Sequence, residues 1–280
     1  MIKFTKMQGL GNDYVYIDAI NQKLENEVEL AKFVSSRHFG VGSDGLILIC
    51  KSEIADFKMR MFNQDGSEAE MCGNGIRCVG KFVYDKGLTN KTTVKIETLA
   101  GIKILNLNVV KEEVETVRVD MGEPILEPKK IPVIANQNPV KNLKVKAIDK
   151  EFICTCVSTG NPHAVTIVED VKNFDVKKYG EVLEIADVFP NKTNVEFIEI
   201  VDKENIKMRV WERGSGETLA CGTGACGSVV ACCLNELTNR NVLVELLRGI
   251  TTNRMEWKGQ SYIYDRTCKN SFWRRVKKWV

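Results

Sequence analysis

The chain has 280 residues, of which 44% are hydrophobic and 28% are charged, and its net charge is +3. A chain of this size and composition can bury one large core or two cores of about 140 residues each, which excludes an intrinsically disordered protein. The segment Asp265–Val280 carries a net charge of +5, so the rest of the chain carries −2. A body this close to neutral has no electrostatic footprint for nucleic acid, and we expect no nucleic-acid partner.

The sequence contains no candidate membrane segment. No apolar run approaches the roughly 20 residues that span a bilayer, and no apolar segment follows the lysines of Met1–Lys6. We therefore expect a cytoplasmic protein without a membrane partner. In that reducing compartment most of the ten cysteines should be free thiols, and the absence of any Cys-x-x-Cys pair predicts no metal site.

The first half of the chain is predicted to be mainly β-structure with two helices. Apolar residues at helical spacing predict one helix over Glu27–His38 and another over Asn74–Lys86, which Gly87 ends. A glycine-rich turn at Gly9–Asp13 separates the first two strands. The predicted strands are Lys3–Gln8, Tyr14–Asp18, Leu46–Cys50, Phe57–Asn63, Thr93–Thr98, Ile102–Val110 and Val114–Asp120.

The second half repeats this order after a proline-rich connection, Glu123–Pro139. A helix is predicted near Asp175–Ala186, and a second over Gly224–Leu237, whose residues are small or apolar nearly all round and should be buried. The predicted strands are Phe152–Ser158, Ala164–Val168, Asn194–Val201 and Ile206–Glu212.

Three separated blocks of sequence recur at one offset of 149 residues. Lys58–Asn63 resembles Lys207–Glu212, and Gly11-Asn12 recurs as Gly160-Asn161. Cys72-Gly73-Asn74-Gly75 recurs as Cys221-Gly222-Thr223-Gly224. We predict an α+β fold of two similar domains related by a pseudo-two-fold axis, each a curled, mainly antiparallel sheet around a central helix. The first half is residues 1–120, with 262–280 as a candidate completion of its sheet, and the second is residues 121–261.

Each half carries a Cys-Gly-x-Gly motif that leads into a helix. Free N–H groups at a helix start bind anions and lower the pKa of a cysteine, and glycine lets a ligand approach the backbone. One such motif alone is more often a tight turn with a packed thiol. Two copies in register favour a pair of acid–base groups, Cys72 and Cys221, of which one removes a proton from a carbon and the other protonates its opposite face.

No motif indicates a cofactor, and we expect none. Gly9-x-Gly11 lacks the surroundings of a dinucleotide fingerprint, and Gly40-x-Gly42-x-x-Gly45 leads into a predicted strand where that fingerprint would open a helix.

Together, four segments resemble the diaminopimelate epimerase family: Lys6–Asp13, Met71–Cys78, Gly160–His163 and Glu212–Ala225. The resemblance runs from about Ile2 to Lys258. It implies a pyridoxal-independent enzyme of lysine and peptidoglycan precursor biosynthesis that interconverts LL- and meso-diaminopimelate and forms a homodimer. It also implies that Cys72 and Cys221 are the catalytic bases.

The resemblance further implies which residues contact the substrate. Backbone amides would hold the reacting carboxylate, and side chains that can bind a zwitterion would hold the rest. The implied backbone contacts are Gly73, Asn74, Gly222 and Thr223, and the implied side chains are Asn12, Asn63, Asn161, Asn194, Glu212 and Arg213. Members of the family often have Gln at the position of Gly45, where this chain departs from the pattern.

Several of these residues have a second interpretation. Asn12 and Asn161 each follow glycine in a turn, where Asn often bonds its own backbone. His163 is either a turn histidine or an acid–base partner of a thiol. Cys78 and Cys226 lie further along their predicted helices and should be core thiols.

Three other functions remain open from sequence. A racemase of the proline type would share the paired cysteines, and a non-catalytic relative would lack them. A redox or metal-binding module would use Cys72 and Cys221 as a disulfide or as ligands.

The end of the chain departs from the family, which usually continues into Met-Thr-Gly-Pro-Ala and an acidic segment. One back-translation from Tyr264 onward, read one base later, encodes Met-Thr-Gly-Pro-Ala-Lys-Thr-Val-Phe-Gly-Glu-Glu. We therefore hypothesise a frameshift near Tyr264. The alternative is a genuine basic tail that binds membrane or nucleic acid through Trp273, Trp279 and the neighbouring cations.

Overall fold

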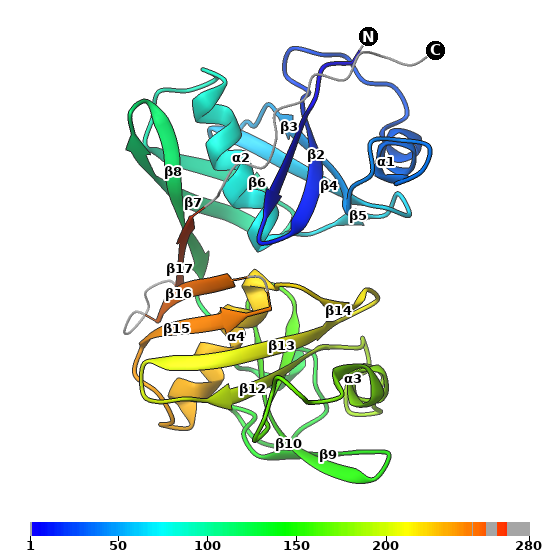
Figure 1. Cartoon of the computed structure of the whole chain (residues 1–280), viewed down its shortest axis with the longest axis vertical. Coiled ribbons are helices and arrows are strands. Elements are labelled where there is room, and N and C mark those ends of the chain that lie inside the picture. Colours follow the sequence, from blue (N-terminus) through cyan, green and yellow to red (C-terminus); the bar gives the residue numbers. More distant parts are fainter. Residues whose placement is uncertain (1, 248, 256–261, 268–280) are drawn as a thin grey trace. The chain divides into compact units, whose positions relative to one another are not determined.

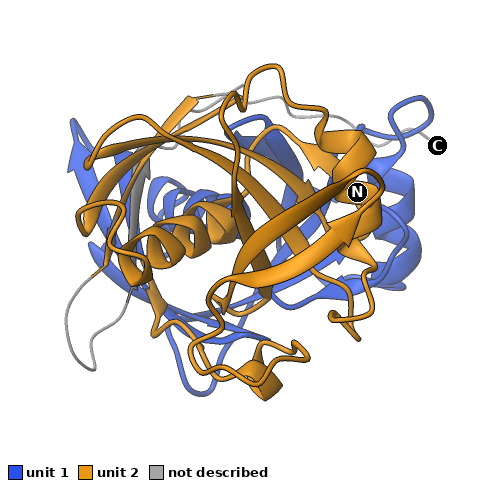
Figure 2. Cartoon of the chain, turned by 90° about the horizontal axis from the view of Figure 1, so that it is seen from below, with its two compact units in different colours: residues 1–119, 266–280 blue, residues 120–265 orange. Residues whose placement is uncertain are grey.

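The computed structural model of the chain describes residues 2–247, 249–255 and 262–267 (Figure 1). Of these, residues 2–119 and 266–267 group into one compact unit and residues 120–265 into a second (Figure 2). No helix in this described part is long and apolar enough to cross a membrane. The frameshift hypothesis concerns a stretch of which residues 268–280 lie outside the described residues.

The first unit is a mixed sheet with two helices. Strands β1 and β2, β3 and β4, and β6 and β7 pair antiparallel, whereas β2 with β3 and β4 with β6 pair parallel. The elements are β1 (Thr5–Gly9), β2 (Asn12–Asp18), α1 (Glu27–Ser35), β3 (Gly45–Cys50), β4 (Phe57–Asn63), β5 (Glu68–Ala69), α2 (Gly73–Asp85), β6 (Thr93–Thr98), β7 (Gly101–Val110) and β8 (Glu113–Gly122).

The second unit has the same order of elements after a short 3-10 helix, η1 (Pro128–Lys130), and an added strand, β9 (Leu143–Ala147). The elements that follow are β10 (Lys150–Ser158), β11 (Pro162–Ile167), α3 (Val176–Glu184), β12 (Asn194–Ile200), β13 (Asn205–Glu212), β14 (Gly216–Thr218), α4 (Gly222–Leu234), β15 (Asn241–Leu246), β16 (Gly249–Met255) and β17 (Tyr262–Thr267).

The two units share the register of their strand pairs as well as the order of their strands. In the parallel pair β2–β3, Tyr14 lies opposite Gly45, and in β11–β12, His163 lies opposite Asn194. Both positions are related by the offset of 149 residues. The predicted α+β fold of two similar, mainly antiparallel halves is therefore confirmed.

Each sheet curls around a helix that is buried along most of its length. Residues 73–83 of α2 and 222–232 of α4 are all buried. Helix α4 packs against β10, β11, β12 and β16, and Figure 2 shows the orange strands curling around a helix. The prediction that the apolar Gly224–Leu237 segment is a buried helix is confirmed, although the helix begins at Gly222 and ends at Leu234.

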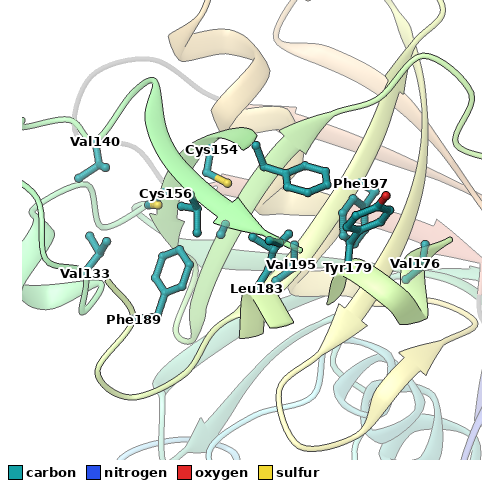
Figure 3. Close-up of a cluster of buried hydrophobic side chains, with 14 of the residues drawn as sticks. Val133, Val140, Cys154, Cys156, Val176, Tyr179, Leu183, Phe189, Val195 and Phe197 are labelled. Carbon is teal, nitrogen blue, oxygen red and sulfur yellow. The ribbon is translucent and has the colours of Figure 1, made fainter. Parts of the chain in front are cut away.

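The core on the other face of the second sheet fixes α3 (Figure 3). Tyr179 and Leu183 of α3 pack against Val195 and Phe197 of β12. The ring of Phe197 also lies 6.1 Å from that of Phe152. This aromatic layer holds α3 against β12 and β13, the strands that carry residues of the candidate site.

Candidate active site

The two repeated cysteines occupy the same structural position, the N-cap of the buried helix in each unit. Cys72 caps α2 with φ −132° and ψ 117°, and its Sγ accepts a hydrogen bond from the Gly75 amide at 3.3 Å. Cys221 caps α4 with φ −119° and ψ 114°, and its Sγ accepts from the Gly224 amide at 3.4 Å. Both sulfurs therefore lie at the positive end of a helix dipole, next to the backbone N–H groups of the first helical turn.

The second glycine of each motif is required by close packing. A Cβ on Gly75 would lie 2.7 Å from Cδ1 of Ile47, and a Cβ on Gly224 would lie 2.6 Å from Oε1 of Glu196. Ile47 and Glu196 are equivalent under the repeat. The helix start thus touches an apolar side chain in the first unit and a carboxylate in the second.

In the first unit a chain of hydrogen bonds orients Asn12 against Cys72. The Cys72 thiol donates to Asn12 Oδ1 at 3.2 Å, and Asn12 Nδ2 donates to Asp44 Oδ2 at 2.8 Å. Arg37 neutralises both Asp44 and Asp13, at 2.8 and 3.0 Å. The amide oxygen of Asn12 is therefore held toward the thiol.

Asn74 and Asn63, the other predicted side chains of the first unit, are not part of this series of hydrogen bonds. Asn74 is buried, and its Oδ1 accepts from Arg77 at 2.7 Å. Gly9, beside Asn12 in the turn, is so close to Asn74 that an added Cβ would lie 3.1 Å from its carbonyl oxygen. Asn63 ends β4 and donates to the Ser67 hydroxyl at 3.0 Å.

In the second unit His163 joins Asn161 to Glu196. His163 is fully buried, with Nδ1 2.7 Å from Glu196 Oε1 and Nε2 2.9 Å from Asn161 Oδ1. Neither of the ring contacts is to the backbone of its own turn. The ring is thus held between Glu196 and Asn161, the asparagine of its own turn. The interpretation of His163 as an acid–base partner of a thiol stays a prediction.

Asn194, Glu212 and Arg213 come together beside this network. Asn194 is buried, donates to the Pro162 carbonyl at 2.7 Å and accepts from the Arg213 amide at 2.9 Å. Glu212 accepts from the Thr218 hydroxyl, and the Arg213 guanidinium donates to the Asn191 carbonyl at 3.3 Å. The candidate residues of the second unit thus include two charged side chains, Glu212 and Arg213.

The electrostatics of Cys221 differ from the sequence-based prediction. Burial raises the pKa of the Cys221 thiol well above its ordinary value, and the carboxylates of Glu212 and Glu196 raise it further. The Thr223 hydroxyl, 3.3 Å from Sγ, and the Gly224 amide lower the pKa, but by less. The prediction of a lowered pKa is wrong for Cys221, because desolvation and the two carboxylates outweigh the hydrogen bonds from Thr223 and Gly224.

The same surroundings shift the pKa of Glu212 upward. Burial is the largest cause, opposed by the hydrogen bond from Thr218, and the nearby Glu196 carboxylate adds to the rise. Two carboxyl groups and a thiol in one desolvated region cannot all ionise at neutral pH without a large electrostatic cost.

Sequence reasoning missed four residues that orient the site: Asp44, Glu184, Glu196 and Tyr14. Glu184 accepts from Trp211 Nε1 at 2.7 Å and from the Gly214 amide at 3.0 Å, so it fixes both sides of the Glu212-Arg213 pair. Tyr14 is buried, and burial with the neighbouring Cys72 raises its pKa. A glutamate inside the apolar run Val195–Ile198 was the one signal in the sequence that could have marked Glu196.

The cysteines outside the motifs agree with the prediction of free thiols. All nine cysteines in the described part of the chain are free, and Cys78 and Cys226 are buried in the core as predicted. No group of three or more His, Cys, Asp or Glu side chains among the described residues could hold a metal ion.

Comparison with known proteins identifies close relatives. The family model described as "Diaminopimelate epimerase" matches residues 4–127 and 155–269. The chain is 58% identical to the diaminopimelate epimerase of Methanococcus maripaludis over 94% of this chain and 95% of that protein. It is 54% identical to the diaminopimelate epimerase of Acetivibrio thermocellus over 94% of both.

Solved structures with much lower identity share the fold. A PhzF-family phenazine biosynthesis protein of Bacillus anthracis superposes with a TM-score of 0.71 at 18% identity, over 99% of this chain and 98% of that one. A hydroxyproline epimerase from Agrobacterium vitis superposes with a TM-score of 0.69 at 14% identity, over 94% and 88%.

Proposed function

This chain belongs to the diaminopimelate epimerase family, and we propose that it interconverts LL- and meso-diaminopimelate by two-base proton transfer between Cys72 and Cys221. One thiolate removes the α-proton, and the other cysteine, as a thiol, protonates the opposite face of the carbon. The roles exchange in the reverse direction.

The observation that carries this proposal is the identical placement of the two cysteines. Each is the N-cap of a buried helix, and each sulfur accepts from the amide three residues later. An inversion needs one acid–base group for each face of the carbon, and a duplicated half-site supplies two of the same kind.

The N-termini of the two helices can also stabilise the carbanion intermediate of this reaction. Removal of the α-proton places negative charge on the adjacent carboxylate, which pre-oriented N–H donors stabilise. The first-turn amides of a helix, here those of Gly73, Asn74, Gly222 and Thr223, do not take part in its i to i−4 backbone hydrogen bonds. We propose that these four amides bind the reacting carboxylate, each pair contributing about 3 to 4 kcal/mol of transition-state stabilisation.

We assign the remaining contacts to side chains around the two thiols. Arg213 suits a carboxylate of the substrate, and Glu212 suits an ammonium group. The amides of Asn12, Asn63, Asn161 and Asn194 complete the binding of the zwitterion. At neutral pH the raised pKa of Cys221 favours its role as the acid, with Cys72 as the first base.

The test is conversion of LL-diaminopimelate by the purified protein without added cofactor. We expect meso-diaminopimelate to form, with loss of the α-proton signal in deuterated water. Turnover of proline in place of diaminopimelate would support a proline-type racemase, and turnover only after addition of pyridoxal phosphate would contradict the two-cysteine mechanism.

The cellular setting follows from the same proposal. We propose a cytoplasmic homodimer that acts in lysine and peptidoglycan precursor biosynthesis. Sedimentation equilibrium tests the assembly, since a monomer at assay concentration would contradict it. Rescue of a lysine auxotroph blocked at this step tests the pathway.

A further inference from the structure

Glu196 is a buried acid to which the proposed mechanism assigns no contact with the substrate. It lies in the middle of β12, is 0% exposed, and has the core residues Val195 and Phe197 on either side. Its Oε1 contacts His163 Nδ1 at 2.7 Å, while its buried Oε2 has no hydrogen-bond partner in the described part of the structure. A carboxyl group is costly to bury, and one with an unsatisfied oxygen is more so.

The first unit has no counterpart of this acid–imidazole pair. The residues equivalent to Glu196 and His163 under the repeat are Ile47 and Tyr14. Helix α4 makes room for the pair with two glycines on one face. A Cβ on Gly224 would lie 2.6 Å from Glu196 Oε1, and one on Gly227 would lie 3.3 Å from the His163 side chain.

The two contacts of the imidazole determine where its protons lie. Nε2 faces Asn161 Oδ1 at 2.9 Å, and an amide oxygen can only accept. Nε2 therefore carries a proton. Nδ1 shares a proton with Glu196, held either on the ring or on the carboxyl group, and both arrangements leave Nε2–H directed at Asn161.

The consequence is a fixed orientation of the Asn161 amide. Its oxygen is engaged by His163, and its amino group has no partner among the described residues. Asn12, the equivalent residue of the first unit, is turned the other way, because its amino group donates to Asp44 and its oxygen faces Cys72. The two halves thus present opposite hydrogen-bonding groups, a donor from Asn161 and an acceptor from Asn12.

We propose that Glu196 is a positioning residue that acts through His163 to hold the Asn161 amide with its amino group directed to a carboxylate of the substrate. This rests on the proposed function, because a fixed donor in one half and a fixed acceptor in the other match the carboxylate and ammonium of an amino acid. Among the described residues the Glu196 carboxyl group hydrogen-bonds only with His163, and the substrate meets only the Asn161 amide.

The proton positions can be measured without any assay of activity. The chain has two histidines, so ¹⁵N-histidine labelling gives two ring systems, and His38→Gln assigns the exposed His38. We expect His163 Nε2 to carry a proton in the free protein. In Glu196→Leu, the ¹⁵N chemical shift of Nδ1 should move to that of a nitrogen without a hydrogen bond. In Glu196→Gln, Nδ1 should keep the shift of a hydrogen-bonded nitrogen. An unprotonated Nε2 in the wild-type protein would overturn the proposal.

Kinetics then test the link to substrate. Glu196→Leu should raise KM for diaminopimelate about 10- to 100-fold with a smaller change in kcat, as expected for one lost oriented bond to a charged group. Glu196→Gln should stay within about threefold of wild type, because its amide can donate to Nδ1 and preserve Nε2–H. Glu199→Gln on the same strand, whose acid pairs with Lys207, is the control and should leave KM unchanged.

A double mutant separates positioning from a general loss of structure. If Glu196 acts through the Asn161 amide, Glu196→Leu should change KM little in an Asn161→Ala background. If the effects of Glu196→Leu and Asn161→Ala on KM are fully additive, the proposal is wrong. It is also wrong if Glu196→Leu changes the nitrogen signals as expected but leaves KM unchanged. A wild-type protein with the expected nitrogen signals but no turnover of diaminopimelate would instead contradict the proposed function.

Discussion

The two thiols have unequal surroundings although their helix caps are alike. Cys72 is half-buried, and its sulfur lies 3.2 Å from the oxygen of an uncharged amide, that of Asn12. Cys221 is buried, with Thr223 beside its sulfur and the carboxylates of Glu212 and Glu196 raising its pKa. The two cysteines thus have the same position at a helix start but different electrostatic surroundings. Such a difference suits a pair in which one thiol starts as the base and the other as the acid.

Replacement of either N-cap cysteine should remove the reaction. Cys72→Ala and Cys221→Ala should each lower kcat for epimerisation at least about 100-fold, because one acid–base group remains for two faces. Cys78→Ala and Cys226→Ala, which change core thiols in the same helices, should keep most of the activity and lose about 1 to 2 kcal/mol of stability. Near-normal turnover in either N-cap variant, measured alongside an unchanged circular dichroism spectrum, is incompatible with the mechanism.

The raised pKa of Cys221 predicts the order in which the thiols react. Iodoacetamide near neutral pH should label Cys72 before Cys221, because only thiolates react and the Cys221 thiol is both buried and protonated. Glu212→Gln removes a carboxylate that raises this pKa and should speed the labelling of Cys221. Peptide mapping over time measures both rates, and faster labelling of Cys221 in the wild-type protein would disprove this assignment.

At this scale the sequence could predict the two N-cap cysteines as candidate bases but not the residues that surround them. Cys72 and Cys221 could be recognised because their motif occurs twice at one offset. Glu196 could be noticed as an acid in an apolar run, but its contact could not be predicted, because residues 194–198 of β12 are buried on both faces and alternation along the strand does not show which side chain meets a helix. The contact depends on Gly224, which lies far away in the sequence.

Helix α3 shows how one element holds the candidate site in place. It packs on β13 through Gly180, where a Cβ would lie 2.6 Å from Cβ and Cγ of Trp211. Trp211 precedes Glu212, and its indole donates to Glu184 at the end of the same helix. Movement of α3 would therefore displace the residues that follow Trp211.

Gly180→Ala should consequently be destabilising by about 1 to 3 kcal/mol through overpacking. Glu181→Ala, at the next and exposed position of the same helix, is the matched control and should change stability by less than about 0.5 kcal/mol. Urea denaturation of both variants gives the comparison. Equal stabilities would show that α3 can shift away from Trp211 at no cost.

Helices and long strands were predictable from periodicity, and short or late strands were not. Phe57–Asn63 and Thr93–Thr98 have the predicted bounds, and each end of the four predicted helices lies within three residues of the observed end. Strands β5 and β14 have two and three residues, too few for any periodic signal. Strand β9 pairs with β10 as an addition to the repeated pattern, so comparison of the halves could not reveal it.

Several thiols are buried in the core of the molecule. Because a buried thiol resists ionisation, we expect the folded protein to lose stability at high pH. Burial raises the pKa of Cys154 and of Cys232 to about 12. The folded state therefore holds these protons more tightly than the unfolded chain. Their stabilising contribution is complete below the ordinary pKa near 9 and is lost as pH rises toward 12.

The free energy of unfolding should fall by about 2 kcal/mol per buried thiol between about pH 8 and pH 10.5. Cys154→Ala should be less stable at the lower pH but should show a shallower decline. Urea titrations at both values measure the two slopes. Identical slopes in the wild-type protein and the variant would contradict the assignment of raised pKa values to buried thiols.

The repeat is the property of the whole chain from which most of the fold could be predicted. One offset of 149 residues correctly indicated two units with the same order of elements and the same helix start, and the structure shows that their strand register also repeats. The two units share a fold but not all of their charged residues. Ile47 and Tyr14 in the first unit correspond to Glu196 and His163 in the second. The chemical difference between the halves had to come from three-dimensional contacts.

The central claim is that two different groups serve the two faces of one carbon. It is tested most directly by conversion of LL-diaminopimelate in deuterated water, stopped early and separated into substrate and product. Two bases predict that meso product carries deuterium at the inverted carbon while recovered LL substrate keeps its proton, because the arriving hydrogen comes from a cysteine already equilibrated with solvent. Product that retains the original proton, or LL substrate that exchanges as fast as product forms, would show a single base at work and would contradict the account.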